Sequence, residues 1–485
     1  MDNLHRRQKA RFALLYSVAA MVFLACGLTP ARAEQDDTAK KLPSNAAEVY
    51  SPIDKAFLRQ PALPGGPELW VPETLLGFPA TIDEPVVLQD LKARLQNEDP
   101  FFRDTLLNLY GRTGYIIQEN PDGTQSQSWA AGPTLWYESG YLRNWLQVGA
   151  AVFSSQPLFA PDGEGGTFLL TKDQDQMTTL GLAYGRMRFL NHELVVGRQH
   201  IKTPYANPHD TRMIPVAFEG AVLTPRHDMV ETFNYITGYL WRYKPRDSSI
   251  FEPFSDGLGV QEDRGMLING VKFNPVQGLT IGAIDYWIAD TLNIAYAEVD
   301  WLWPTSTHDP KYRFSINYTD QRSVGKQLIE GAPYNTFQVS ARFAVSFRAL
   351  TLRTAVSANG DDADILSPFG SFPAYTILDE AHFERAGEQA IDFGVVYDFS
   401  DLITDGLKLQ IRYGQGTDAV DPKTGVSLPD RKEWNLNLDY RPTSGPLENV
   451  RFYVDYARLV LRDDTIPRRT VPRFVAIFTY LVPLL

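Results

Sequence analysis

The sequence is poor in cysteine and in long apolar runs. Its 485 residues include a single cysteine, Cys26, which excludes an internal disulfide and a cysteine-rich metal site. After Leu28 there is no uncharged apolar run of about 18 residues, so the sequence predicts no membrane-spanning helix beyond that point.

Positive charge and catalytic motifs are also scarce. Aspartate and glutamate (58) outnumber lysine and arginine (46), and this acidic balance argues against a nucleic-acid partner. The seven histidines form no His-Glu-x-x-His motif, and the sequence contains neither a Gly-x-Ser-x-Gly elbow nor a glycine-rich phosphate loop. We therefore expect no catalytic residue, no metal and no cofactor.

Aromatic residues, by contrast, are abundant. The chain holds 23 tyrosines, 27 phenylalanines and 9 tryptophans. Such residues are favoured in β-sheets and at membrane interfaces. The length suits either about two or three soluble domains or one very large β-domain.

The first 33 residues have the three parts of a secretory signal. Residues 6–11 are basic, residues 12–28 are apolar, and residues 31–33 read Ala-Arg-Ala, a small-x-small cleavage site. A transmembrane anchor is disfavoured because the apolar run is short for a bilayer. A lipoprotein signal is disfavoured because Phe-Leu-Ala-Cys at 23–26 has an atypical first residue. We predict a signal peptide over residues 1–33, cleaved near Ala33.

Residues 34–99 differ in composition from the rest of the chain. The segment 61–85 is rich in proline, and residues 86–96 predict one short helix with Asp83 as its cap. Three leucines share one face of this helix, namely Leu88, Leu91 and Leu95. We interpret 34–99 as a periplasmic extension. Two roles fit it: the helix packs against the main domain, or the extension binds a partner or partly plugs a pore.

From Pro100 onward, apolar and polar residues alternate in segments bounded by turn residues. The clearest segments are 312–319, 337–347, 391–399 and 434–440. Side chains on a strand alternate between its faces, so each segment has one apolar face and one polar face. Such strands form either a soluble sandwich with its apolar face inward or an outer-membrane barrel with its apolar face outward.

Three features favour the barrel. The alternating segments are longer than the strands of typical sandwiches, short and long connections alternate, and aromatic residues gather near strand ends. The short connections are near 190–192, 274–276, 348–350 and 444–446, and the long ones are 156–172, 202–215, 242–262, 359–384 and 417–429. We therefore predict an all-β fold, a transmembrane antiparallel β-barrel of about 18 strands over residues 100–485 with an N-terminal periplasmic extension.

Several sequence blocks follow one another in a recognisable order. They are Phe101–Leu109, Trp129–Gly132, Trp136–Tyr141, Glu193–Gln199, Asp210–Pro215, Phe218–Gly220, Ile411–Tyr413 and Glu433–Asn435. Together these blocks resemble the OprD family of outer-membrane porins, and Phe101–Leu109 is similar to the first strand of that family. The resemblance covers about residues 100–485, whereas the extension 34–99 departs from the compact members of the family.

The resemblance implies a monomeric or loosely trimeric barrel whose third outer loop folds inward and narrows the pore. Here that loop is Lys202–Gly220, which its prolines keep out of the sheet. Polar residues that would line the constriction are Tyr205, Asn207, His209, Asp210 and Arg212. The alternative for these residues is ordinary turn chemistry, in which Asn and Asp bind the local backbone.

Strand parity predicts which charged side chains face the lumen. With the apolar face outward, six cations from six of the last eight strands share one wall: Arg313, Arg342, Arg353, Lys408, Arg412 and Arg451. Five carboxylates face the same lumen: Asp392, Asp398, Glu433, Asp439 and Asp455. A column of positive charge favours the passage of a carboxylate. The alternative is that these cations and carboxylates form structural pairs that brace the wall.

Together these features predict a porin in the outer membrane of a Gram-negative bacterium. It would let small polar or carboxylate-bearing solutes, such as amino acids and organic acids, diffuse passively into the periplasm. The alternatives are a barrel plugged by its extension that acts as a scaffold or receptor, and a channel for hydrophobic or aromatic compounds. We also expect contacts with outer-membrane lipid and lipopolysaccharide, and insertion by the barrel-assembly machinery.

Overall fold

The computed structural model describes residues 86–226, 232–303, 310–329, 333–442, 445, 447–462 and 469–485. The predicted signal peptide and the extension up to residue 85, including Asp83, lie outside the described residues. So do residues 444 and 446 of one predicted turn.

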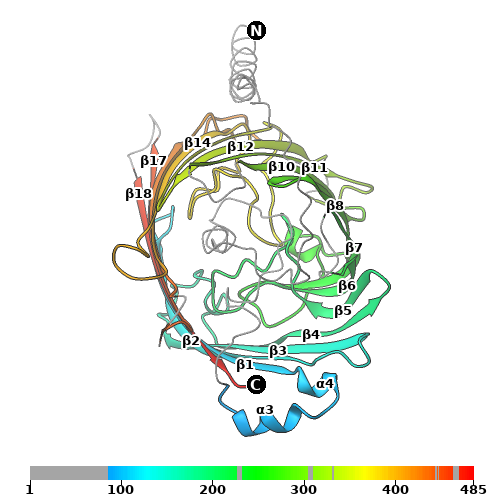
Figure 1. Ribbon diagram of the computed structural model, residues 1–485. Helices are drawn as coiled ribbons and strands as arrows, with labels where there is room; N and C mark the ends of the chain where they lie inside the picture. The colour runs from blue at the N-terminus through cyan, green and yellow to red at the C-terminus, as the bar shows by residue number, and fades with distance from the viewer. Residues whose placement is uncertain are drawn as a thin grey trace, which may run out of the picture. The chain divides into compact units, whose positions relative to one another are not determined.

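The described chain forms a closed antiparallel β-barrel of 18 strands (Figure 1). Each strand pairs with its neighbours in the sequence, and β1 (Leu106–Glu119) closes the ring by pairing with β18 (Arg469–Pro483). Closure pairs the backbone groups of both edges, as a β-structure in lipid requires. The predicted fold class and number of strands are confirmed.

The remaining strands follow in chain order around the ring. They are β2 (Gln125–Glu138), β3 (Leu146–Phe159), β4 (Met177–Phe189), β5 (His192–Gln199), β6 (Ala217–Pro225), β7 (Phe233–Lys244), β8 (Met266–Val276), β9 (Leu279–Ile288), β10 (Leu292–Trp303), β11 (Lys311–Ser323), β12 (Asn335–Phe347), β13 (Leu350–Asn359), β14 (Gln389–Asp398), β15 (Leu407–Thr417), β16 (Asp430–Tyr440) and β17 (Val450–Arg462). A short 3-10 helix, η3 (Asp256–Leu258), lies between β7 and β8.

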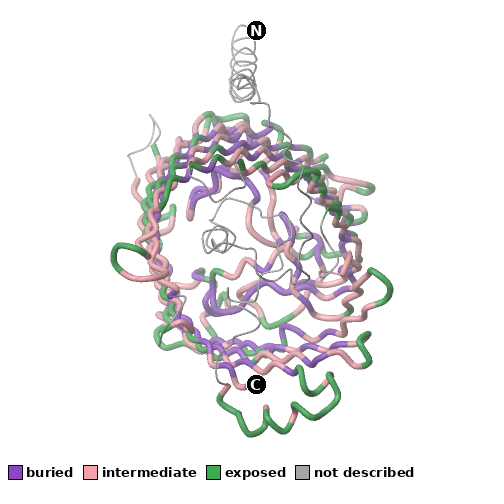
Figure 2. The backbone as a smooth tube through the Cα atoms, in the orientation of Figure 1, coloured by how far each residue is buried: buried purple, intermediate pink, exposed green. Residues whose placement is uncertain are grey.

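Alternation along the strands separates the outer face of the barrel from its lumen. On β14, Ile391, Phe393 and Val395 are 38%, 51% and 42% exposed, whereas Asp392 between the first two is fully buried. The same alternation of buried and exposed positions runs around the wall (Figure 2). An outward apolar face and a polar lumen are the arrangement of a membrane barrel.

The alternation of polarity fails on the wall formed by β6 to β10. Ile268 and Ile284 are buried on the inner face, while Leu267 and Ile281 are exposed on the outer face. The inner residues belong to a hydrophobic cluster that includes Tyr205 from the loop between β5 and β6. This wall is apolar on both faces because chain rather than water covers its inner side.

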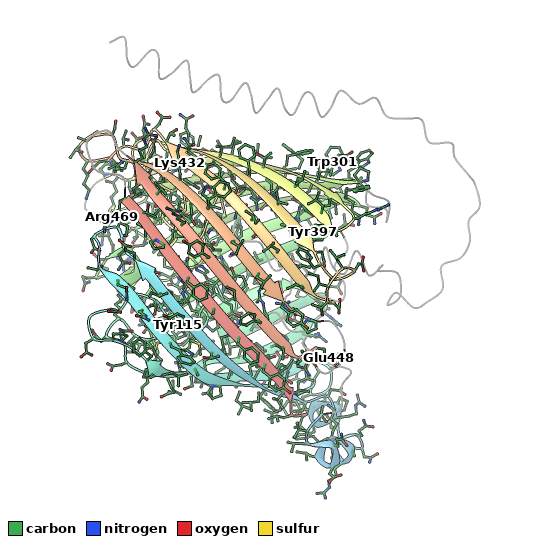
Figure 3. All side chains as sticks on the ribbon, turned by 90° about the vertical axis from the view of Figure 1, so that its left-hand side faces the viewer. Tyr115, Trp301, Tyr397, Lys432, Glu448 and Arg469 are labelled. Atoms are coloured by element: carbon green, nitrogen blue, oxygen red, sulfur yellow. The ribbon has the colours of Figure 1, made fainter. Side chains whose placement is uncertain are left out.

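The long connections gather at one end of the barrel. They are residues 160–176, 200–216, 245–265, 360–388 and 418–429. Tight turns at 190–191, 277–278 and 348–349 lie at the other end, together with the start of β1 and the end of β18. Figure 3 shows Lys432 and Arg469 at the long-loop end and Tyr397 and Glu448 at the short-turn end. The predicted asymmetry of the connections is confirmed.

Two short helices precede the barrel. The predicted helix is present as α3 (Gln89–Leu95), and α4 (Pro100–Arg103) follows it. The first strand was expected from Phe101 but begins at Leu106, because Asp99 caps α4 by accepting the Phe101 amide at 2.9 Å. In the described part of the chain, no helix has the length and apolar character needed to cross a membrane.

Candidate functional site

The loop between β5 and β6, residues 200–216, crosses the lumen. At one side the Asp210 carboxylate accepts a hydrogen bond from Arg112 of β1, with Nη1 2.6 Å from Oδ1. At the other side the Tyr205 hydroxyl lies 3.0 Å from Thr319 Oγ1 of β11. Strands β1 and β11 stand on different sides of the ring, and Figure 1 shows the loop inside it. The inward direction implied by the family resemblance is therefore present.

Local turn chemistry gives this loop its shape. The Asn207 carbonyl oxygen Oδ1 accepts the His209 amide at 3.2 Å, and the Asn207 Nδ2 donates to the Thr203 and Pro204 carbonyls at 3.3 and 3.2 Å. His209 itself adopts the left-handed backbone conformation, with φ of 42°. For Asn207, the alternative of ordinary turn chemistry describes what the side chain does within its own loop.

A second loop, residues 360–388 between β13 and β14, also folds into the lumen. It meets the β5–β6 loop at Asn207. The side-chain Oδ1 of Asn207 accepts the Ser371 backbone amide at 3.2 Å, and the backbone amide of Asn207 donates to the Phe369 carbonyl at 3.3 Å. The approach is close enough that a Cβ on Gly370 would lie 2.6 Å from Asn207 Nδ2. The two loops therefore behave as one unit inside the barrel.

The sequence predicts this second loop to be an outer loop and indicates no site residue in it. A usable signal was present, because the loop is rich in large apolar residues that an outer loop would expose to water. Phe369, Tyr375 and Phe383 are all fully buried.

Tyr375 anchors the β13–β14 loop to the charged wall. Its carbonyl oxygen accepts hydrogen bonds from Arg353 Nη2 at 2.6 Å and Arg412 Nη2 at 3.3 Å. Its amide donates to Ser340 Oγ at 2.8 Å, and its hydroxyl donates to Glu298 Oε1 at 2.7 Å. Arg353 and Arg412 thus face the lumen and also hold the β13–β14 loop against the wall.

All six predicted cations lie on the wall built from β11, β12, β13, β15 and β17, and each has a carboxylate within 4.0 Å. The pairs are Arg313–Asp300 (2.9 Å), Arg342–Asp300 (3.5 Å), Arg353–Asp392 (2.9 Å), Arg412–Asp392 (3.0 Å), Lys408–Asp398 (3.5 Å) and Arg451–Asp439 (3.0 Å). Lys408 and Arg412 share β15, so the cations come from five strands and not from six. Asp300 of β10 pairs with two of these cations but lies outside the last eight strands, to which the predicted charged wall is confined.

Two of the predicted carboxylates do not pair with these cations. Glu433 accepts backbone amides of the β13–β14 loop, at 3.1 Å from Asp379 and Glu380 and 2.5 Å from Ala381. Asp455 is 2% exposed, and its Oδ1 has no hydrogen-bond partner among the described residues. Glu433 therefore holds the second loop in place, which its position on β16 alone did not reveal.

Arg212 is the predicted cation that forms no direct ion pair with the described residues. Its Nε donates to the Thr167 carbonyl at 2.9 Å and its Nη1 to the Thr211 carbonyl at 2.7 Å. In the described part of the chain, no carboxylate lies within 4.0 Å of its guanidinium. Burial and the charges of Arg473 and Arg246 lower the pKa of Arg212 well below its usual value. An anion placed here would relieve this repulsion.

The neighbours of Arg212 add both signs of charge to the site. Arg246, from the loop between β7 and β8, donates to Thr211 Oγ1 at 2.9 Å, and Arg473 of β18 pairs with Glu380 at 3.0 Å. Burial and the charges of Arg246 and Arg212 lower the pKa of His209 well below its usual value. These residues come from four separate segments, so only the fold brings them together.

Comparison with known proteins identifies the barrel. A family model described as outer membrane porin, OprD family, matches residues 99–480. A search of curated proteins found no match.

Several solved structures share the fold. The crystal structure of Pseudomonas aeruginosa OpdK with vanillate is 19% identical with a TM-score of 0.68, covering 78% of this chain and 99% of that one. P. aeruginosa OccK9 (OpdG) is 21% identical and Acinetobacter baumannii OccAB2 is 19% identical. Each has a TM-score of 0.70, and each match covers 80% of this chain and 100% of the other chain. The family match extends over most of the barrel, and the chain therefore belongs to the OprD family of outer-membrane porins.

Proposed function

We propose that this outer-membrane porin lets small carboxylate-bearing solutes, amino acids and organic acids among them, diffuse passively into the periplasm. The observation that carries the proposal is the buried Arg212 guanidinium of the inward β5–β6 loop, close to two further arginines and without a carboxylate of the described residues within 4.0 Å. A carboxylate is the group that a guanidinium binds best, through two parallel hydrogen bonds.

The arrangement of charge also suits passage rather than retention. Glu380 and Asp455 lie near Arg212 and Arg473. The two arginines would attract a solute carboxylate, and the two protein carboxylates would compete with it for them. Weak binding of this kind speeds selective diffusion, because a solute has to leave the site as readily as it arrives. An amino acid would present its ammonium group to the carboxylates and its carboxylate to the arginines.

The other two readings have less support. The inner wall of β6 to β10 is apolar, as a channel for hydrophobic compounds would require, but its side chains are packed against the lumen loops. Tyr286 and Ile294 are each 1% exposed. For a plug formed by the extension 34–99, residues 34–85 lie outside the described residues, and α3 (Gln89–Leu95) lies outside the ring (Figure 1).

Liposome swelling with matched solutes tests the proposal. Arg212→Gln is expected to slow the influx of small carboxylates by about 10-fold or more, since a hydrogen bond to a charged group contributes about 1.5–3 kcal/mol. Uncharged sugars of similar size are expected to enter at the rate of the unmodified protein, because the substitution removes charge and little volume.

The matched control is Arg322→Gln. Arg322 is more than half exposed on β11 and pairs with Asp320 at 2.5 Å. We expect it to leave both fluxes unchanged. Equal slowing of carboxylates and sugars by Arg212→Gln would show that Arg212 shapes the loop and selects no solute.

A further inference from the structure

The helical segment before the barrel, residues 87–104, lies outside the ring. Figure 1 shows α3 and α4 beside β1 and away from the lumen, and Figure 3 shows them at the short-turn end, near Glu448. In outer-membrane barrels the short turns face the periplasm. The segment therefore stands at the level where the wall leaves the periplasmic side of the bilayer.

The segment is tied to the rim by backbone contacts. The Val87 and Leu88 amides donate to the Pro483 and Leu484 carbonyls, each at 3.0 Å, and the Gly140 amide donates to the Phe101 carbonyl at 2.9 Å. A Cβ on Gly140 would lie 1.9 Å from the Pro100 carbonyl oxygen, so only glycine allows this approach. The helices are held against the wall and cannot swing freely into the periplasm.

The exposed surface of this segment includes four large apolar side chains. Val87, Leu88, Leu91 and Phe102 are 61%, 40%, 41% and 51% exposed. Isolated exposed apolar residues are ordinary on a protein surface, but four within one short segment are costly in water.

The apolar surface continues onto the wall of the barrel. Directly after α4, β1 turns Leu107 and Leu109 outward, and Leu135, which pairs with Leu109 on β2, is 44% exposed. This wall is the lipid-facing surface of the porin. The helical segment carries charges of both signs: Lys92 donates to the Thr105 carbonyl, Arg103 pairs with Asp104 at 2.9 Å, and the exposed Arg94 has the basic character that favours the headgroup region.

We propose that residues 87–104 form an interfacial anchor, seated in the headgroup and acyl boundary of the periplasmic leaflet beside β1. Leu91 and Phe102 dip into the lipid, and the exposed Arg94 reaches the phosphates. The anchor fixes the periplasmic rim at the seam where β1 and β18 close the barrel.

Site-directed fluorescence in vesicles tests the anchor. Cys26 is replaced by Ser in the full chain, and single cysteines at Leu91→Cys or Phe102→Cys carry an environment-sensitive dye. The barrel is folded into phosphatidylcholine–phosphatidylglycerol vesicles with or without a nitroxide-bearing lipid. Heat-modifiable migration on gels confirms that each variant is folded.

The references are Leu352→Cys on the outer wall, where Leu352 is 49% exposed, and Asp162→Cys in an exposed outer loop. We expect dyes at positions 91 and 102 to shift to the blue and to be quenched almost as strongly as the dye at 352. A dye at Ala93→Cys, on the opposite side of α3, is expected to be quenched less.

Two results overturn the proposal. Quenching at 91 and 102 no stronger than at 162, with red emission, would place the segment in water. Blue emission without lipid quenching would mean that protein covers it, either residues 34–85 of the same chain or a second copy.

Discussion

Replacing Asp392 by Asn is expected to destabilise the barrel through two arginines at once. The Asp392 carboxylate is fully buried between Arg412, whose Nε donates to Oδ2 at 3.0 Å, and Arg353, whose Nη2 lies 2.9 Å from Oδ1. Asn keeps the volume of the side chain and removes its charge. Both guanidinium groups would then remain in the wall without their counter-ion.

The size of the effect follows from burial and distance. Two unit charges about 3 Å apart attract by about 5 kcal/mol at an effective dielectric constant of about 20, and breaking a buried pair costs about 3–5 kcal/mol. The Arg353 contact lacks hydrogen-bond geometry at Oδ1, so it contributes through charge alone. We expect Asp392→Asn to lower the free energy of unfolding by about 3–5 kcal/mol.

Urea titration of the barrel in lipid vesicles, followed by tryptophan fluorescence, measures the loss. The control is Asp320→Asn, which removes the partner of the exposed Arg322 and is expected to cost no more than about 1 kcal/mol. If the two substitutions lower the unfolding free energy equally, the buried pairs do not brace the wall.

Two further outcomes concern the lumen loops. Burial lowers the pKa of His200 to about 3. Below about pH 6.5 the unfolded chain therefore binds a proton at His200 that the folded protein does not bind. Acidification from about pH 7 to about pH 5 should therefore lower stability by up to about 1.4 kcal/mol per pH unit from this group, and urea titrations of His200→Phe should show a shallower dependence. Gly414→Val should displace the β13–β14 loop from the wall, because a Cβ at Gly414 would already lie 2.6 Å from Leu378 of that loop. We expect this displacement to widen the pore and raise the single-channel conductance. Gly111→Val, where nothing lies within 4 Å, is the control, and an equal change in both variants would contradict the displacement of the loop.

The lumen is divided into two unlike halves. The wall from β6 to β10 is covered by packed loop residues such as Tyr205 and Phe369, whereas the wall from β11 to β18 carries the charged pairs. Loop residues also cover part of the charged wall, because Arg353 and Arg412 hold the Tyr375 carbonyl of the β13–β14 loop. Arg212 lies on the β5–β6 loop, and its Nε donates to the Thr167 carbonyl of the β3–β4 loop at 2.9 Å.

The strands and their facing could be read from the sequence because both depend on local rules. Alternation with period two sets which side chains share a face, and lipid outside the barrel selects the apolar face for the exterior. Phe393 and Asp392 illustrate this, since their neighbouring positions alone predict one outward and one inward side chain. The lengths of the connections likewise predicted which end of the barrel carries the long loops and which carries the tight turns.

The partners and the constriction were decided only by the tertiary structure. Parity places Arg412 and Asp392 in the lumen but does not say that register sets them 3.0 Å apart. Asn207 and Ser371 meet although they are far apart in the sequence, and their contact joins the two inward loops. A loop turns inward when the wall opposite it offers matching partners, and those partners are assembled only when the ring of strands has closed.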